Sequence, residues 1–273
     1  MTATTFQPTQ TFSLTFPGVV KSEWIKLMSV RWTWWCAVLQ LVLGTGFTYL
    51  MSMTLTKDDA VISGITDGMP VLLANQGLVF VGTVTTAVFG VLAASSEYSS
   101  GSIRSTLAAV PHRGTVLGAK MLVTSFFMLV LGLVAESIGA GLASWVCSMR
   151  GFDTPIGAEG WGMFAGAVFA MVVWTLMSLG LGMALRSSAG GIATALGLFL
   201  LLDMILGLAR SNELIATLGN LTPLSSGSLM FMSVVTPGED SVLGGYWGGA
   251  ACLAGWVVLC LTAGYVVLKK RDA

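Results

Sequence analysis

The chain has 273 residues, of which 55 % are hydrophobic and only 10 % are charged, and its formal net charge is zero. A soluble domain usually carries about 25 % charged residues, so this chain has too few to cover a water-facing surface. The composition therefore predicts a polytopic membrane protein, and the balanced charge gives no support for nucleic-acid binding.

The N-terminal part of the chain predicts a tail followed by a surface helix. Residues 1–17 lack the basic and apolar regions of a signal peptide, so we expect a flexible cytoplasmic lead-in. Residues 18–31 form an amphipathic pattern, with Val20, Trp24, Leu27 and Met28 on one face and Ser22, Lys26 and Ser29 on the other. We expect this helix to lie in the membrane interface with its basic side toward anionic lipid. An alternative is that it extends the first span into the cytoplasm.

Six segments are long and apolar enough to cross a bilayer, which needs about 20 apolar residues per helix. They cover residues 32–54, 71–94, 117–145, 161–185, 190–209 and 246–268. Only R-S-S-A separates the fourth from the fifth, which predicts a tight helical hairpin. The expected fold is thus all-α, an integral membrane protein with six transmembrane helices.

The basic residues predict the topology, because Lys and Arg accumulate on the cytoplasmic side. Ten of the 13 lie in the N-terminal segment, the second and fourth connections and the C-terminus: Lys21, Lys26, Arg31, Arg104, Arg113, Lys120, Arg186, Lys269, Lys270 and Arg271. Both termini, including the tail 269–273, are therefore predicted to be cytoplasmic. Six spans agree with two ends on one side.

The second connection, 97–113, is a polar interruption between two apolar runs. Gly101 is expected to break the helix of the second span, and Pro111 to end a short helix over 103–110. Ile103, Leu107 and Val110 recur at helical spacing, so this short helix should present one apolar face. A rigid, partly apolar helix at the cytoplasmic surface is typical of a docking element, although it could also simply cap the turn.

The connection over 210–245 is too apolar for an ordinary loop and too interrupted by Pro223 and Gly227 for a span. We expect short re-entrant or interfacial helices packed on the outer mouth of the bundle.

Motifs for catalysis, phosphate binding and metal binding are not found in the sequence. It has neither a G-x-x-x-x-G-K-[ST] phosphate loop nor a G-x-G-x-x-G motif. His112 is the single histidine, so it cannot build a multi-histidine metal site, and we interpret it as an interfacial polar residue. The four cysteines show no metal spacing; buried free thiols are expected, with a Cys147–Cys252 bridge as the alternative.

Two carboxylic acids lie inside predicted spans, Glu136 in the third and Asp203 in the fifth. A carboxylate in a bilayer is costly, so such residues usually face the bundle interior or a water-filled cavity. Both are candidates for a translocation path or a proton site, or else for structural hydrogen bonds. For Asp203, an ion pair with Arg210, two turns further along the chain, is an additional expectation.

The order of residues around the second connection resembles that of ABC-2 type transporter permeases. Glu97 leaves the second span, Gly101-Ser102 opens the short helix, and Pro111 and Arg113 follow before Lys120 in the third span. The opening S-E-W-I-K-L-M-S-V-R-W-T-W-W also resembles that of actinobacterial members. Ser102 stands where threonine is frequent, and His112 where a smaller or apolar residue is commoner, so the detailed contacts stay open.

The resemblance implies the membrane subunit of a bacterial ABC exporter in the plasma membrane. Two permease chains, identical or paralogous, would pair, and two ABC ATP-binding subunits would dock and hydrolyse ATP with Mg. This chain would then hold no cofactor and catalyse nothing itself. The implied ATPase contacts are Glu97, Ile103, Arg104, Leu107, Val110 and Arg113. The mostly apolar spans favour a lipophilic or amphipathic cargo, such as a drug, antibiotic, peptide or lipid.

Three other functions stay open on the sequence. One is a proton-coupled secondary transporter that uses Glu136 or Asp203. Another is a membrane-embedded enzyme, which would need these two carboxyls as a close pair. The last is a structural or sensor subunit without transport activity.

Overall fold

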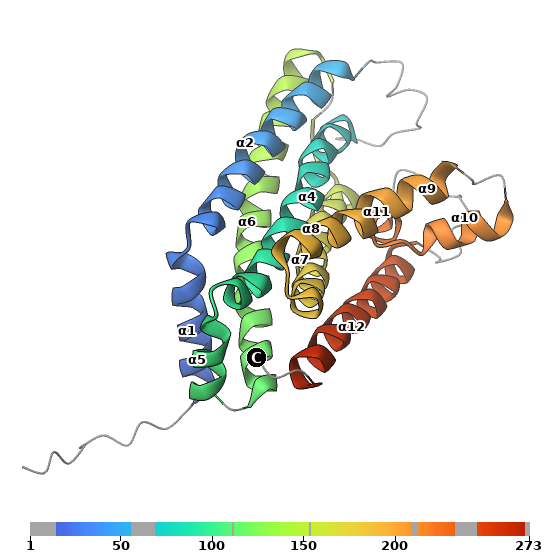
Figure 1. The fold of residues 1–273 in the computed structure, drawn as a ribbon. Helices are drawn as coiled ribbons and strands as arrows, with labels where there is room; N and C mark the ends of the chain where they lie inside the picture. Colours follow the sequence, from blue (N-terminus) through green and yellow to red (C-terminus); the bar gives the residue numbers. More distant parts are fainter. Residues whose placement is uncertain are drawn as a thin grey trace, which may run out of the picture.

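The computed structural model describes residues 15–55, 69–110, 112–152, 154–208, 212–232 and 245–270. In this part of the chain the architecture is helical throughout, and six helices are long and apolar enough to cross a membrane. The all-α membrane fold predicted from the sequence is confirmed (Figure 1).

The described part of the chain begins with a surface helix and continues into spans that are longer than the apolar runs alone indicate. The first elements are α1 (Phe16–Ser29), α2 (Arg31–Thr54), α4 (Met69–Ser99), α5 (Ser102–Ala109) and α6 (Arg113–Met149). Helices α4 and α6 continue past the apolar stretch into polar sequence, toward α5. This extension brings charged side chains of both helices to one end of the bundle.

The second half of the chain consists of α7 (Ala158–Leu185), α8 (Ser188–Leu196), the π-helical turn η1 (Gly197–Leu201), α9 (Leu202–Leu208), α10 (Glu213–Asn220), α11 (Pro223–Met232) and α12 (Tyr246–Lys270). Arg186 takes a left-handed conformation (φ 54°) between α7 and α8, which makes the tight hairpin expected there. Helices α10 and α11 are the short helices expected within 210–245. That they lie on the outer side stays a prediction.

Helices α4 and α7 form the centre of the bundle, and the other spans pack around them. Phe89, Trp174 and Met177 are fully buried between the helices. The two central helices approach so closely at Gly90 that a Cβ there would lie 2.3 Å from the carbonyl oxygen of Thr175. Small residues permit such close helix packing in membranes. Trp174 Nε1 also donates to the Pro223 carbonyl at 3.1 Å, which fixes the start of α11.

The segments predicted to be cytoplasmic gather at one end of the bundle. Helices α1 and α5, the start of α6 and the end of α12 lie together at the bottom of Figure 1. Arg113, at the start of α6, donates to the carbonyl oxygens of Leu268 and Lys269 at the end of α12. Arg186 donates to the Val267 carbonyl at 3.2 Å, so the α7–α8 turn belongs to the same end.

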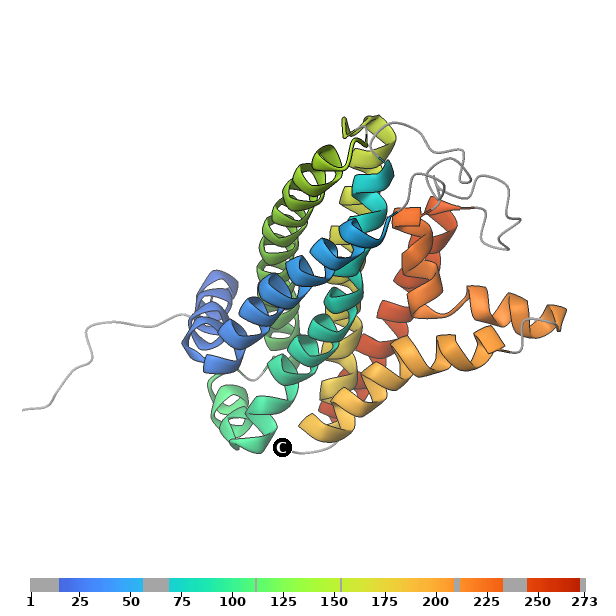
Figure 2. The same ribbon diagram turned by 90° about the horizontal axis from the view of Figure 1, so that it is seen from above.

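The first half of the fifth span packs on α4 and α7, whereas its second half leaves the bundle. Seen from above in Figure 2, α8 and α9 extend to one side, and α10 lies beside them. Leu201, Met204, Ile205 and Leu208 are all more than half exposed. Within one chain this apolar face is therefore uncovered.

Candidate functional site

Four helices meet where α5 joins the bundle. Gly101 adopts a left-handed conformation (φ 72°), which ends α4 and turns the chain into α5. Helix α5 runs over Ser102–Ala109, one residue earlier than predicted. Helix α1 spans Phe16–Ser29 rather than 18–31, and the extended Val30 separates it from α2. Helix α1 then lies beside α5 and packs along α6 (Figure 1).

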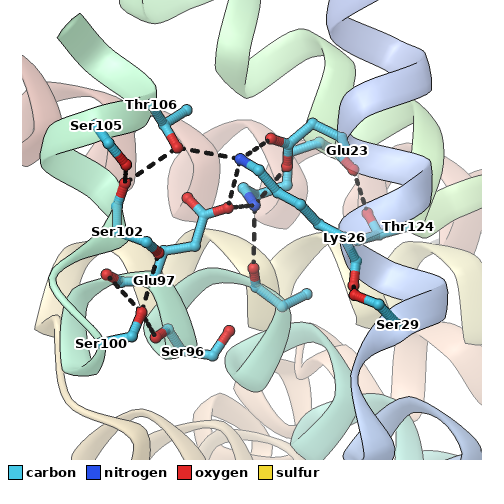
Figure 3. A network of polar contacts seen from close by, with 12 residues as sticks. Glu23, Lys26, Ser29, Ser96, Glu97, Ser100, Ser102, Ser105, Thr106 and Thr124 are labelled. Carbon is cyan, nitrogen blue, oxygen red and sulfur yellow. Dashed lines mark hydrogen bonds and ion pairs between the residues drawn. The ribbon is translucent and has the colours of Figure 1, made fainter. Parts of the chain in front are cut away.

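The polar centre of this junction is a four-membered ionic network, which comprises Glu23, Lys26, Glu97 and Lys120 (Figure 3). Lys120 Nζ lies 2.7 Å from Glu23 Oε2 and 3.0 Å from Glu97 Oε1. Lys26 Nζ lies 2.6 Å from Glu23 Oε1 and 3.2 Å from the same Glu97 oxygen. The two carboxylates and two ammonium groups therefore alternate, and the network has no net charge.

The network is largely shielded from solvent. Glu23, Glu97 and Lys120 are 4 %, 8 % and 8 % exposed, so each charge depends on its partners for stabilisation. Burial acts to raise the pKa of Glu23, but the contacts with Lys120 and Lys26 outweigh it and hold that pKa below its ordinary value. Burial likewise acts to lower the pKa of Lys26, and Glu23 and Glu97 outweigh it, so that this pKa is raised. Both shifts favour the charged forms.

Lys26 also connects the network to the short helix. Its Nζ donates to Thr106 Oγ1 at 3.1 Å, and Thr106 in turn donates to the Ser102 carbonyl. The expectation that the basic side of α1 faces lipid is thus wrong for Lys26. Its ammonium group turns toward α4 and α5, because two carboxylates lie there.

The residues that the resemblance assigned to an ATPase contact are placed in different surroundings. Glu97 lies inside the network, and Ile103 is only 7 % exposed because it packs on its own chain. Val110 is half-buried after the end of α5. Arg113 contacts α12, as described above. Their contact with a partner stays a prediction.

Two members of that predicted contact, Arg104 and Leu107, have side chains outside the described part of the structure, as do Pro111 and Arg210. On the described surface of α5, Ser105 and Ala108 are exposed. His112 precedes α6, and its side chain is exposed. That placement agrees with a polar residue at the surface.

A cavity of about 400 Å³ opens beside the network. It lies between α1, α2, α4, α5 and α6, and its walls include Leu27, Trp32, Ala93 and Val123. Its polar lining comes from the network, from serines of α1, α4, α5 and the α4–α5 turn, and from Thr124 of α6. The site thus combines charge, an apolar wall and space for a small molecule.

Glu136 is buried in the middle of the bundle, away from this junction. It is 1 % exposed, and its Oε2 accepts a hydrogen bond from Asn75 Nδ2 of α4. Its Oε1 has no hydrogen-bond partner among the described residues. Gly139, one turn along α6, leaves room for the Asn75 side chain.

Asp203 is held by hydroxyl groups. Its Oδ1 accepts from Thr222 Oγ1 at 2.5 Å and from Ser225 Oγ at 2.6 Å, which links α9 to α11. Glu136 and Asp203 thus have separate partners and share none, which gives the paired-carboxyl enzyme no support.

The described part of the chain holds no group of three or more His, Cys, Asp or Glu side chains placed to bind a metal ion. All four cysteines are free thiols, so Cys147 and Cys252 are not paired.

The network was not predicted from the sequence, although Glu23 and Lys26 lie in the N-terminal S-E-W-I-K stretch and Glu97 and Lys120 flank the second connection. Glu23 received no role, and Glu97 was assigned to a partner rather than to Lys26 and Lys120. A signal was present, since Glu23 and Lys26 are three residues apart on one helix, and Glu97 and Lys120 leave their spans on the same predicted side. Charges at the rim of a bundle tend to pair when packing removes them from water.

Comparison with known proteins gives one family. The family model described as ABC-2 family transporter protein matches residues 18–273, which covers the whole of the helical bundle. No curated protein sequence matches the chain.

Proposed function

Since the chain belongs to the ABC-2 family of transporter proteins, we propose that it is the membrane subunit of an ATP-driven exporter whose ATP is hydrolysed by separate subunits. Family membership makes it a multi-pass membrane component of an ABC transporter that associates with an ABC ATP-binding subunit. Export, the cargo and the stoichiometry belong to the proposal.

The observation that carries the proposal is the attachment of α5 to the bundle. This short helix is connected through Lys26–Thr106 to α1 and, through Glu97 and Lys120, to α4 and α6. A force applied to α5 therefore reaches three other helices through short polar contacts. Such contacts are suited to transmit closure of an ATP-binding subunit, because a buried ion pair tolerates little displacement before its charges are left unpaired.

We place the partner contact on α5 and its flanks, over 97–113, with both termini in the cytoplasm of a bacterial cell. Two ATP-binding subunits, which bring ATP and Mg, would dock beneath a pair of permease chains. In this arrangement Ser105 and Ala108 offer an exposed surface, whereas Ile103 and Glu97 hold α5 in place from the side of the bundle. Arg104, Leu107, Val110 and Arg113 complete the proposed contact region.

The second permease chain, identical or paralogous, is proposed to cover the uncovered side of α9. Leu208 is 84 % exposed there, and Leu214 of α10 is 75 % exposed. Contact with lipid alone would also cover these apolar side chains. The cargo is proposed to be lipophilic or amphipathic and to leave along the interface between the two chains.

The test is co-expression with ATP-binding proteins from the same genome, starting with any that is encoded beside this chain. We expect the two proteins to purify together and ATP hydrolysis to exceed that of the ATP-binding subunit alone. As a control, the catalytic glutamate of the partner is replaced by glutamine, which should abolish hydrolysis and leave association intact. If no ATP-binding protein associates with the chain, the proposal is wrong.

A second candidate function, a proton-coupled secondary transporter, rests on the buried Glu136 and its unpartnered oxygen. It requires transport driven by a pH gradient without ATP. We expect instead that cargo movement in vesicles stops without ATP and survives collapse of the pH gradient, in wild type and in Glu136→Gln alike.

A further inference from the structure

The cavity beside the ionic network has the dimensions and lining of a small-molecule site. Its volume of about 400 Å³ falls within the range of about 300–1,000 Å³ that is typical of ligand pockets. Ser29, Ser100 and Ser102 at its rim are exposed, whereas Leu27 and Val123 in its wall are buried. The cavity therefore has a polar mouth and, inside, an apolar wall beside the largely buried ionic network.

Two polar atoms of its lining residues are left without partners. Glu97 Oε2 and Trp32 Nε1 are buried and have no hydrogen-bond partner among the described residues. A buried donor or acceptor without a partner is unfavourable, so a small rotation of these side chains toward an occupant of the cavity would be stabilised by the hydrogen bond that then forms. Glu97 Oε2 is an acceptor and Trp32 Nε1 is a donor, so a ligand that pairs with both must carry a donor and an acceptor.

The charge balance of the site restricts the ligand further. Glu23 and Glu97 are compensated by Lys26 and Lys120. A ligand with a net charge would bring an uncompensated charge into a largely buried place, which is unfavourable. A hydroxyl or amide group can donate and accept without adding charge.

We infer that this cavity binds an uncharged amphipathic small molecule that carries a hydroxyl or amide group, and that it serves as the entry site for cargo from the cytoplasmic side. The apolar part lies against Leu27, Trp32 and Val123, and the polar group reaches Glu97 Oε2 and Trp32 Nε1. The assignment as an entry site rests on the proposed function; binding itself does not. Because Ser102 of α5 and Ser29 of α1 line the same cavity, an occupant contacts both helices and is positioned to report to the ATP-binding subunit.

The inference is tested with three probes that share a naphthalene ring and differ in charge: 2-naphthol, 2-naphthoate and 2-naphthylmethylammonium. Binding is measured by equilibrium dialysis at neutral pH against the permease in phosphatidylcholine nanodiscs, and binding to empty nanodiscs is subtracted. We expect saturable binding of one 2-naphthol per chain, about tenfold tighter than that of either charged probe, because each charged probe brings an uncompensated charge into the site.

Two variants locate the binding. Val30→Trp places a large ring in the cavity wall and should remove saturable binding, whereas Val42→Trp, on the exposed side of α2, should leave it unchanged. Trp32→Phe keeps an aromatic ring but removes the N–H donor, and should weaken 2-naphthol binding about fivefold. Unchanged affinity in both Val30→Trp and Trp32→Phe, equal or tighter binding of a charged probe, or no saturable binding would each overturn the inference.

The outcome is separable from that of the proposed function, because the dialysis uses the permease without its partner. If 2-naphthol binds in the dialysis but no ATP-binding protein associates with the chain on co-expression, the binding site stands and the exporter proposal is wrong. If an ATP-binding protein associates but 2-naphthol does not bind, the exporter proposal stands and the binding-site inference is wrong.

Discussion

Lys120 Nζ lies 2.7 Å from Glu23 Oε2, although the two residues are 97 positions apart in the chain. The contact joins the first part of α6 to the surface helix α1, and both side chains are about 90 % or more buried. Such a contact stabilises only as part of a complete network, because either charge alone would be buried without compensation. The junction around α5 is thus sensitive to the removal of one member.

The first prediction concerns Lys120. Lys120→Met leaves Glu23 and Glu97 with Lys26 as their single cation in the network, so that one buried negative charge is uncompensated, and should destabilise the bundle by about 3–5 kcal/mol. The measurement is thermal or denaturant unfolding in nanodiscs. Lys120→Met combined with Glu23→Gln restores neutrality and should regain part of the loss. A double variant no more stable than the single one would contradict this interpretation of the network.

The second prediction concerns the link between α5 and α1. Thr106→Val removes the acceptor for Lys26 Nζ at nearly constant volume. We expect the ATP-binding subunit to associate as before, while cargo transport per ATP hydrolysed decreases severalfold, because α5 is less firmly connected to α1. Thr262→Val is the matched control, since the Thr262 hydroxyl donates within α12, to the Val258 carbonyl at 2.6 Å and the Leu259 carbonyl at 3.0 Å. Equal transport in both variants would show that the link does not transmit.

The third prediction is the pH dependence of stability. The pKa of Glu23 is lowered below 4.5 in the folded chain, so its contribution is complete above pH 4.5 and is lost as the pH falls through the folded value. The pKa of Lys26 is raised above 10.5, so its contribution is complete below pH 10.5 and is lost at higher pH. These two groups should therefore leave stability unchanged between about pH 5 and 10.

Melting temperatures of wild type and Glu23→Gln across this range check the acid side. The variant should be less stable at neutral pH, and the difference from wild type should shrink below pH 4.5. A difference that stays constant down to pH 3 would mean that the Glu23 carboxylate has no special stabilisation in the folded state.

The fourth prediction concerns the close packing around Glu136. In Gly139→Ala the new Cβ would lie 2.2 Å from Asn75 Oδ1 and 2.9 Å from Leu78 Cδ1, so the Asn75–Glu136 hydrogen bond must be displaced. We expect a clear decrease of the melting temperature. Gly141→Ala lies on the same helix and meets nothing within 4 Å. It should be neutral or stabilising by up to about 1 kcal/mol, because alanine favours the helix. Equal effects of the two substitutions would contradict the packing described for α4 and α6.

Span positions were predictable because each apolar run carries its own signal. The boundaries at Thr54 and Leu185 agree with those read from the sequence, and the hairpin after α7 follows from the short R-S-S-A connection. The end of α4 was placed too early and the start of α6 too late, since both helices continue into polar sequence that the junction with α5 buries. Helix length there depends on tertiary contacts and not on hydropathy.

Side-chain partners were harder to predict than helices. Asp203 was expected to meet Arg210 along its own helix, but the described partners are Thr222 and Ser225 from the segment around α11. Glu97 was read as a surface charge because it leaves a span at the predicted cytoplasmic end. Its burial follows from how α1 packs on α6, which no local pattern contains. The π-helical turn η1 likewise has no signal in the sequence.

Cross-linking from α5 to the ATP-binding subunit tests the central claim most directly. Ala108→Cys, in a chain whose four native cysteines are replaced by alanine, is labelled with a short cysteine-to-lysine cross-linker and mixed with the partner. Ser137→Cys, exposed in the middle of α6, is the matched control. The account predicts a cross-linked complex from position 108 and none from position 137. The absence of a cross-link from 108 in a complex that still purifies together would contradict α5 as the docking helix.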